Sequence, residues 1–133
     1  MTQEDKKLLL KDLCARFPYR VKCRYYDCCE GDYYEGTIYG FEKQEYIQID
    51  GVCIYIEEVM PYLSPMSSMT EEQKKEYEKV CELDTEILEK HTMDGTPFPA
   101  LYNSQDWLNA HHFDYRNLIN KNLAIDCTNL NIY

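Results

Sequence analysis

The sequence predicts an α+β fold, and three observations lead to this prediction. Residues 1–17 and 71–90 carry apolar side chains at helical spacing. Residues 19–66 instead alternate polar with apolar side chains and are rich in β-branched and aromatic residues, which is typical of strands. The 133 residues are 44% hydrophobic and 29% charged, as in a folded domain. We expect one structural unit, in which residues 67–133 form a helical extension packed on residues 1–66.

The first segment predicts an amphipathic helix that ends before Pro18. Thr2 is a candidate N-cap, and Asp5 follows three residues later. The apolar residues at helical spacing are Leu9, Leu10, Leu13, Cys14 and Phe17. Such a stripe can bind a partner, but in a small domain it more often packs on the protein's own core, and this is the expected arrangement.

The alternating region predicts four short strands, at residues 19–26, 33–41, 45–50 and 52–57. Asp50-Gly51 predicts a two-residue type I′ turn, because both positions of that turn need positive φ. Closely spaced short strands favour a small SH3-like antiparallel β-barrel, although an open twisted sheet packed on the first helix gives the same pattern. We expect residues 57–63 to form a short helical turn, because Pro61 and Pro65 limit regular structure there.

A second long helix is predicted at residues 71–90, with Thr70 and Gln73 as a capping box. Its apolar face consists of Tyr77, Val80, Cys81, Ile87 and Leu88. Residues 91–103 follow as a loop interrupted by Gly and Pro, which predicts a boundary or a mobile segment.

The stretch "WLNAHHFDYR" (residues 107–116) predicts a corner between two short helices. Asn103 or Ser104 is the expected N-cap of the first helix, whose apolar anchors are Trp107 and Leu108. Asp114 is the expected N-cap of the second helix, at residues 114–121. A structural corner is the favoured interpretation, and we expect no catalytic residues here.

The alternative for this corner is a hydrolase or metal site built from His111, His112 and Asp114. Adjacent residues on a helix point about 100° apart, so the two histidines cannot easily share one metal ion. The residue types alone therefore do not establish a site.

The charge of the chain limits its expected partners. The formal net charge is −10, and no segment is basic enough to neutralise phosphates, so we expect no nucleic-acid partner. No apolar stretch approaches the roughly 20 residues of a membrane span, and no signal peptide is recognisable, so we expect a soluble, cytoplasmic protein without membrane contact.

The seven cysteines are expected to be reduced thiols, because their number is odd and no export signal precedes them. Cys23, Cys28 and Cys29 form no C-x-x-C pair, and strand alternation places Cys23 on an apolar face. We therefore expect neither a metal site nor a cofactor.

Three blocks of the sequence resemble a family of short uncharacterised proteins from gut bacteria and their phages and prophages. The blocks are "MTQEDKKLLLKDLCARFPYRVKC", "VMPYLSPMSSMTEEQKKEY" and "WLNAHHFDYRNLINKNLAI". Members often have glycine where this chain has Asn117 and Asn122, and Asn122 is expected to adopt the left-handed conformation that glycine allows. The resemblance implies an accessory role in a mobile element, where small proteins commonly bind a host component or a signalling molecule.

The 13 tyrosines are the remaining unusual feature. Tyrosine offers flat apolar contact and a polar tip at low entropic cost, which suits recognition surfaces. The candidate ligand-binding residues are Tyr25, Tyr34, Tyr39, Arg24 and Arg116. Exposed aromatic side chains on an acidic barrel favour peptides, cations or planar rings as ligands.

The favoured functional hypothesis is a non-enzymatic binding or adaptor protein of phage or mobile-element origin that engages a host protein, with counter-defence as one such role. A second hypothesis is a small-molecule binder such as a nucleotide-signal sponge. It requires Arg20, Arg24 or Arg116 to converge with aromatic side chains in one pocket.

Overall fold

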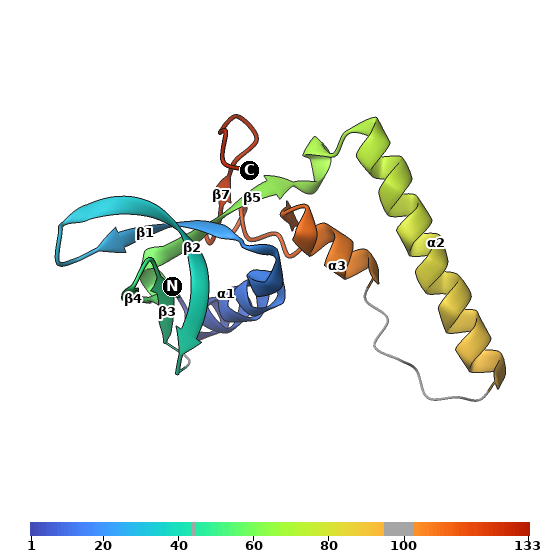
Figure 1. Cartoon of the computed structure of the whole chain (residues 1–133), viewed down its shortest axis with the longest axis horizontal. Helices are drawn as coiled ribbons and strands as arrows, with labels where there is room; N and C mark the ends of the chain where they lie inside the picture. Colours follow the sequence, from blue (N-terminus) through green and yellow to red (C-terminus); the bar gives the residue numbers. More distant parts are fainter. Residues whose placement is uncertain (44, 95–102) are drawn as a thin grey trace.

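The computed structural model describes residues 1–43, 45–94 and 103–133, so most of the expected loop at 91–103 lies outside the described residues. The helices are α1 (Gln3–Arg16), α2 (Glu71–Asp94) and α3 (Asn103–Ala110). The strands are β1 (Lys22–Asp27), β2 (Asp32–Glu42), β3 (Tyr46–Ile49), β4 (Val52–Tyr55), β5 (Val59–Pro65), β6 (Phe113–Asp114) and β7 (Ile125–Asp126). The prediction of an α+β fold that begins with a helix is confirmed (Figure 1).

The strands form one mixed sheet in the order β4-β3-β2-β1-β5-β6, and β7 also pairs with β5. The predicted barrel is wrong, because the sheet is not closed. The long strand β2 pairs with β1 through its first half and with β3 through its second half, with an irregularity between Ile38 and Gly40. The far edge of β5 pairs in parallel with β6 and β7, so this edge is taken by the C-terminal residues and β4 stays at the other end of the sheet.

The helical turn predicted at residues 57–63 is present only at residues 57 and 58, and residues 59–63 belong to strand β5. A short 3₁₀ turn at Ile56–Glu58 leads into β5, which contains both prolines. Pro61 lies opposite Cys23 of β1, and the pairing of β5 with β7 begins one residue later, at Tyr62. The strand is mostly buried, so packing outweighs the weak strand preference of proline.

The turn at Asp50-Gly51 is confirmed. Asp50 has φ 50° and Gly51 has φ 81°, and the flanking residues Ile49 and Val52 are paired, as a two-residue type I′ turn requires. The turn lies close to Gly36 of β2, where a Cβ atom would collide with the side chains of Ile49 and Asp50. Glycine at position 36 therefore lets the β3–β4 hairpin fold against β2.

Helix α1 closes one side of the main core. Its N-terminus has the predicted capping box, in which Thr2 and Asp5 exchange hydrogen bonds. Leu9 and Leu13 are fully buried among the apolar residues of β1 to β5. Cys14 and Phe17, which the helical pattern also assigned to the apolar stripe, are exposed. Asp12 and Arg16 are buried in their place.

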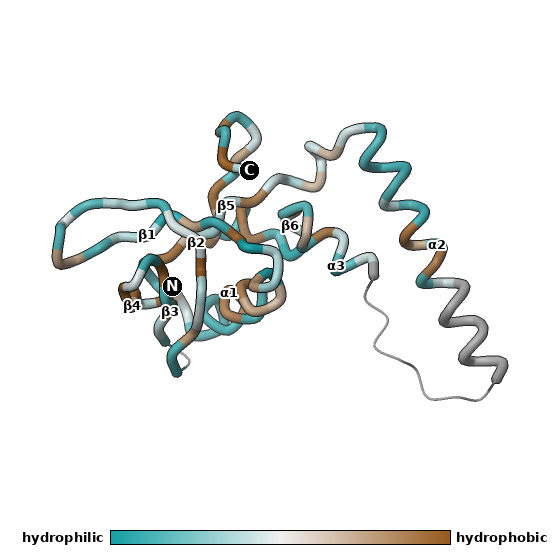
Figure 2. Tube along the Cα trace, viewed as in Figure 1, coloured by the Kyte–Doolittle hydropathy of each residue, from teal (hydrophilic) through white to brown (hydrophobic). Residues whose placement is uncertain are grey.

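Helix α2 begins with the predicted capping box, because Thr70 and Gln73 exchange hydrogen bonds. Its residues Tyr77 and Val80 pack against a second apolar cluster, which consists of Met69, Trp107, Leu108 and Phe113. The side chains of Ile87 and Leu88 lie outside the described residues. The first turns of α2 are strongly hydrophilic (Figure 2). Among the described residues, no helix has both the length and the apolar character needed to cross a bilayer.

The helix predicted at residues 114–121 is absent, and a series of turns takes its place. The Asp114 carboxylate accepts hydrogen bonds from the backbone N–H groups of Leu118 and Ile119, both at 2.9 Å, so it caps a turn within a strand-to-turn segment. Asn117 and Asn122 have φ values of 61° and 59°. The left-handed conformation of Asn122 agrees with expectation, whereas that of Asn117 lies inside the predicted helix and interrupts it.

Candidate functional site

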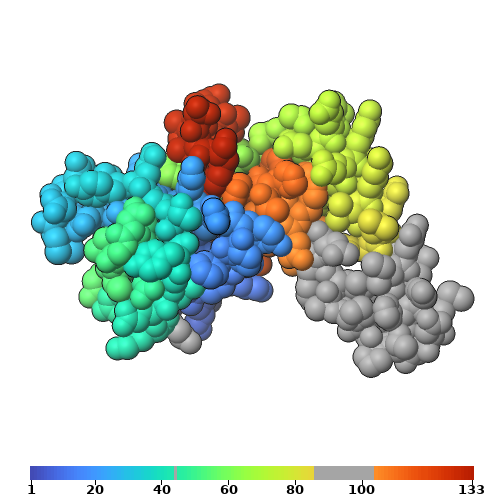
Figure 3. All heavy atoms as spheres, viewed as in Figure 1, coloured from blue at the N-terminus to red at the C-terminus, as the bar shows by residue number. Residues whose placement is uncertain are grey.

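The β1–β2 hairpin projects from the body of the molecule (Figures 1 and 3). The two strands pair over six residues each, from Lys22 opposite Thr37 to Asp27 opposite Asp32. Strand β5 supports β1 only from Cys23 to Tyr25. The end of the hairpin therefore extends beyond the third strand, and both of its faces are open there.

One face of this end carries Arg24, Tyr26, Tyr33 and Glu35, and we call these residues the hairpin face. The rings of Tyr26 and Tyr33 are 5.1 Å apart, and the Arg24 guanidinium lies 4.9 Å from the centre of the Tyr33 ring. Tyr33 is 60% exposed. The hairpin face therefore combines a stacked cation with a largely exposed aromatic ring, which is an arrangement suited to contact with another molecule.

The charges of Arg24 and Glu35 are not paired with each other, although the two residues are cross-strand neighbours. The Tyr62 hydroxyl donates to the Glu35 carboxylate at 2.9 Å. Within the described part of the chain, Arg24 has no carboxylate within 4.0 Å and contacts the Met60 sulfur at 3.7 Å instead. Arg24 is thus held in place by Met60 and the Tyr33 ring.

The opposite face of the hairpin carries Tyr25 and Tyr34, whose rings are 6.0 Å apart. Tyr25 is buried, and its hydroxyl donates to the Asp50 carboxylate at 3.4 Å. Burial, followed by the nearby Asp50 charge, raises the pKa of Tyr25. Tyr34 is 41% exposed. This face therefore changes along its length from the core of the protein to solvent.

The hairpin end is strongly acidic. Residues 27–35 include Asp27, Glu30, Asp32 and Glu35 and no Lys or Arg. The Oδ1 atom of Asp27 accepts hydrogen bonds from the N–H groups of Cys29 and Glu30, at 2.9 and 3.4 Å. The turn at the tip is thus fixed by a carboxylate while its other acidic groups face solvent.

The five residues predicted to bind a ligand do not form one site. Tyr25 and Tyr34 lie on one face of the hairpin, and Arg24 lies on the other. Tyr39 is 51% exposed and lies further along β2, and Arg116 binds Asp12 of α1. Sequence reasoning missed Tyr26 and Tyr33 as partners of Arg24, because their pairing depends on the register set by the Asp27–Asp32 turn.

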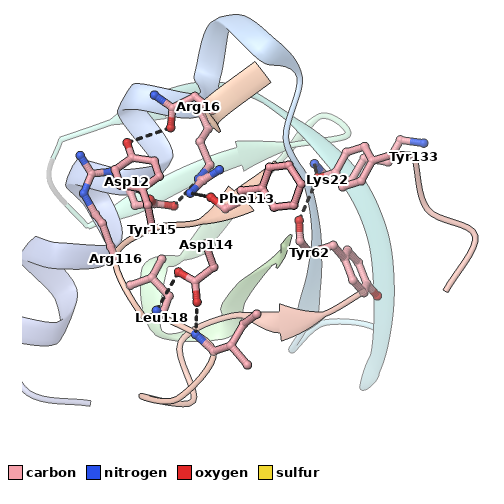
Figure 4. Close-up of polar contacts among 12 residues, drawn as sticks. Asp12, Arg16, Lys22, Tyr62, Phe113, Asp114, Tyr115, Arg116, Leu118 and Tyr133 are labelled. Atoms are coloured by element: carbon pink, nitrogen blue, oxygen red, sulfur yellow. Dashed lines mark hydrogen bonds and ion pairs between the residues drawn. The ribbon is translucent and has the colours of Figure 1, made fainter. Parts of the chain in front are cut away.

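Arg116 belongs to a buried polar cluster between α1 and the C-terminal residues (Figure 4). The Asp12 carboxylate accepts hydrogen bonds from Arg16 Nε at 2.7 Å and from Arg116 Nη1 at 2.9 Å. Arg16 also donates to the Phe113 carbonyl oxygen at 2.6 Å. The Tyr115 ring lies near both guanidinium groups, at 5.2 Å from Arg16 and 4.7 Å from Arg116. These contacts attach the segment after α3 to α1.

The residues proposed for a hydrolase or metal site have separate partners. His111 Nδ1 lies 2.8 Å from the Trp107 carbonyl oxygen, and its ring stacks on Trp107. His112 stacks on Tyr133, with ring centres 3.6 Å apart. Burial, followed by the Arg16 charge, lowers the pKa of His112 to about 4. In the described part of the chain, no hydrogen bond joins His111, His112 and Asp114 to one another.

Tyr133 connects the end of the chain to the sheet. Its hydroxyl accepts a hydrogen bond from the Lys22 N–H at 2.9 Å and donates one to the Tyr62 carbonyl oxygen at 3.0 Å (Figure 4). Burial raises the pKa of this phenol. The Tyr133 side chain thus contacts β1 and β5 through its hydroxyl and His112 through its ring.

A pocket of about 490 Å³ lies beside β6 and β7. Its lining residues are Pro65, Met66, Ser67, Asp114, Tyr115, Asn117, Ile119, Asn120 and Asp126. Two carboxylates and no Lys or Arg are among these residues, so the pocket does not suit a phosphate-bearing ligand.

The hairpin face is the strongest candidate site, because its exposed side chains are not explained by packing of the core. No protein-family model, curated protein or solved structure matches this chain.

Proposed function

We propose that this protein is a non-enzymatic binding protein whose β1–β2 hairpin docks on a basic surface of another protein. One observation carries the proposal: exposed tyrosines, Tyr33 at 60% and Tyr34 at 41%, occupy both faces of a projecting hairpin whose end is acidic. Tyrosine is enriched among the residues that dominate binding energy at protein interfaces. Complementary charge adds specificity and speeds association.

The charge distribution supports a protein partner over a nucleic acid. A net charge of −10 and a hairpin end with four acidic residues repel a phosphate backbone. Basic protein surfaces offer both the cations that attract these carboxylates and the apolar area that tyrosine rings cover.

The biological setting of the proposal rests on the sequence. The resemblance of residues 1–23, 59–77 and 107–125 to proteins of gut bacteria and their phages supports a bacterial host protein as the partner. We place this interaction in the cytoplasm and propose counter-defence as its role.

A small-molecule binder is the second candidate, and the 490 Å³ pocket is the observation that favours it. This volume lies within the range of about 300–1,000 Å³ that ligand sites occupy. A nucleotide-signal sponge is the less suitable version, because Arg24 and Arg116 contact different partners and neither lines the pocket. A neutral or cationic ligand agrees better with Asp114 and Asp126.

The test compares the tagged wild-type protein with two single variants in host lysate. Tyr33→Ala removes the exposed ring of the hairpin face, and Tyr55→Ala removes a ring of similar exposure, 51%, from β4. Captured proteins are quantified by mass spectrometry. The affinity of the purified partner is then measured by calorimetry.

We expect wild type and Tyr55→Ala to capture the same partner and Tyr33→Ala to lose it. A loss of about 2 kcal/mol, or roughly thirtyfold in Kd, is typical of a dominant interface residue. Equal affinity of both variants for that partner would show that the hairpin is not the docking element. A wild-type protein that captures no partner would favour the pocket instead.

A further inference from the structure

The tip of the β1–β2 hairpin brings together three side chains that can bind a metal ion. One ligand atom each from Asp27, Cys28 and Cys29 lies within 4.8 Å of the other two. Both cysteines are exposed, and Asp27 is half-buried. We propose that these three residues form a binding site for a thiophilic divalent cation of the Zn²⁺ class. This site is separate from the hairpin face and does not depend on the proposed protein partner.

The backbone of the tip holds these ligands in position. The Gly31 N–H donates to the Asp27 carbonyl oxygen at 2.7 Å, and Gly31 adopts φ 73°, which closes the turn. Asp27 Oδ1 accepts the hydrogen bonds from Cys29 and Glu30, so this oxygen orients the carboxylate. Within the described chain, Asp27 Oδ2 makes no hydrogen bond and is available to a cation. The carboxylate therefore fixes the loop through one oxygen and can coordinate through the other.

The donor set agrees with the chemistry of Zn²⁺. Zinc takes thiolate sulfur at about 2.3 Å and carboxylate oxygen at about 2.0–2.2 Å, and tetrahedral coordination then places its ligands roughly 3.5 Å apart. The three ligand atoms, which lie within 4.8 Å of one another, need to approach by at most about 1.3 Å, and rotation of exposed side chains can supply this movement. Two sulfurs and one oxygen leave a fourth position for water. Each thiol releases its proton to solvent when it coordinates.

The charges around the tip favour a cation. Residues 27–35 include Asp27, Glu30, Asp32 and Glu35 and contain no Lys or Arg. A divalent cation is attracted by these carboxylates and neutralises the thiolates that coordinate it.

The other cysteines provide a contrast. Cys23 is fully buried, and burial raises the pKa of its thiol. Cys53 is exposed and its sulfur lies 3.3 Å from the Glu42 carboxylate, but this pair offers only one thiol. Cys53→Ser is therefore a matched control, because it removes an exposed thiol beside a carboxylate elsewhere in the same sheet.

The experiment titrates Co²⁺, a spectroscopic substitute for Zn²⁺, into the full-length protein under a reductant that does not bind metals. Coordination by thiolate produces a sulfur-to-cobalt charge-transfer absorption, and competition with Zn²⁺ against a chromogenic chelator gives the affinity. We expect wild type and Cys53→Ser to bind one ion with this absorption. Cys28→Ser and Cys29→Ser should each reduce it, and the double variant should abolish it.

Asp27→Asn should weaken Zn²⁺ affinity by about tenfold or more, because even indirect partners of a metal contribute that much. Circular dichroism confirms that the variants fold, which is expected because the tip is exposed. A wild-type protein without the charge-transfer absorption overturns the proposal. Equal absorption in the Cys28→Ser/Cys29→Ser variant also overturns it.

Discussion

The surroundings of His112 determine the position of its ring and its protonation state. The residue adopts φ 61°, its ring stacks on Tyr133, and its Nδ1 atom is buried without a hydrogen-bond partner among the described residues. Burial and the Arg16 charge lower its pKa to about 4, from an ordinary value of 6.5. The imidazole is therefore neutral at pH 7 in the folded protein, and it acts as a flat stacking surface.

This lowered pKa predicts a loss of stability in acid. Above pH 6.5 the imidazole is neutral in both states, so it contributes no pH dependence. As the pH falls from 6.5 to 4 the unfolded chain binds a proton that the folded protein excludes, and the free energy of unfolding decreases by at most about 1.4 kcal/mol per pH unit. Urea unfolding of the wild type, measured between pH 7 and pH 4, should show this decrease.

The matched variant is His112→Asn, because asparagine tolerates positive φ but does not titrate. We expect this variant to have lower stability at pH 7, since the stack on Tyr133 is lost. Its stability should also depend less on pH between 6.5 and 4. Parallel curves for the two proteins would mean that His112 is not held neutral by the fold.

The Asp12 carboxylate joins helix α1 to the segment that follows α3. Asp12 is fully buried and binds both Arg16, four residues along the same helix, and Arg116, more than a hundred residues away in the chain. Buried charges are costly when they lose their partner. Without Asp12, the guanidinium groups of Arg16 and Arg116 would lose the negative charge with which both are paired.

Asp12→Ala should destabilise the protein by about 3–5 kcal/mol, which is the usual cost of breaking a buried ion pair from one side. Chemical denaturation at pH 7 measures the difference. Lys11→Ala, an exposed substitution in the same helix, should change stability by less than about 0.5 kcal/mol. If Asp12→Ala unfolds at the same denaturant concentration as Lys11→Ala, the buried cluster does not hold α1 to the C-terminal segment.

Local signals in the sequence identified the elements whose ends are fixed by nearby residues. The caps at Thr2 and Thr70 and the turn at Asp50-Gly51 depend on side chains within three residues, and all are confirmed. The pairing of β5 with β6 and β7 depends on residues far apart in the chain, so no local pattern indicates it. For the same reason, the strand pattern could not distinguish the open sheet from the predicted barrel.

The candidate site was predictable only in its residue types. Tyrosines and Arg24 were identified, but the strand register that separates Arg24 from Tyr25 and Tyr34 depends on the turn at residues 27–32. Absence of a C-x-x-C pair argued against metal binding by Cys28 and Cys29. That argument considered Cys23 as their partner, whereas the folded turn supplies Asp27.

At the scale of the whole molecule, negative charge and shape act together. The protein carries a net charge of −10, and its hairpin extends the acidic residues of the tip away from the body (Figure 3). Exposed charges act over about 10 Å at 0.1 M ionic strength and about 3 Å at 1 M. Electrostatic attraction to a basic partner should therefore act before contact and depend on salt.

We expect the association rate with the partner to fall as salt is raised from about 0.1 M to about 1 M, because screening shortens the reach of these charges. Glu30→Gln/Asp32→Asn should reduce both the rate and its salt dependence. Glu72→Gln/Glu78→Gln removes two exposed charges from α2 and is the control, with wild-type behaviour expected. Surface plasmon resonance measures the rates, and identical salt dependence in the three proteins would contradict steering by the hairpin.

The parallel pairing of β5 with β6 and β7 has a consequence for how the chain is made. β5 ends at Pro65, and its partners begin only at Phe113 and Ile125. A ribosome adds about 5–20 residues each second, so one edge of β5 waits on the order of seconds for the strands that cover it. An uncovered edge that carries apolar residues is a template for pairing with other chains. The newly made protein is therefore most exposed to aggregation while α2 and α3 are being translated, and cells that slow synthesis in that interval lengthen the exposure.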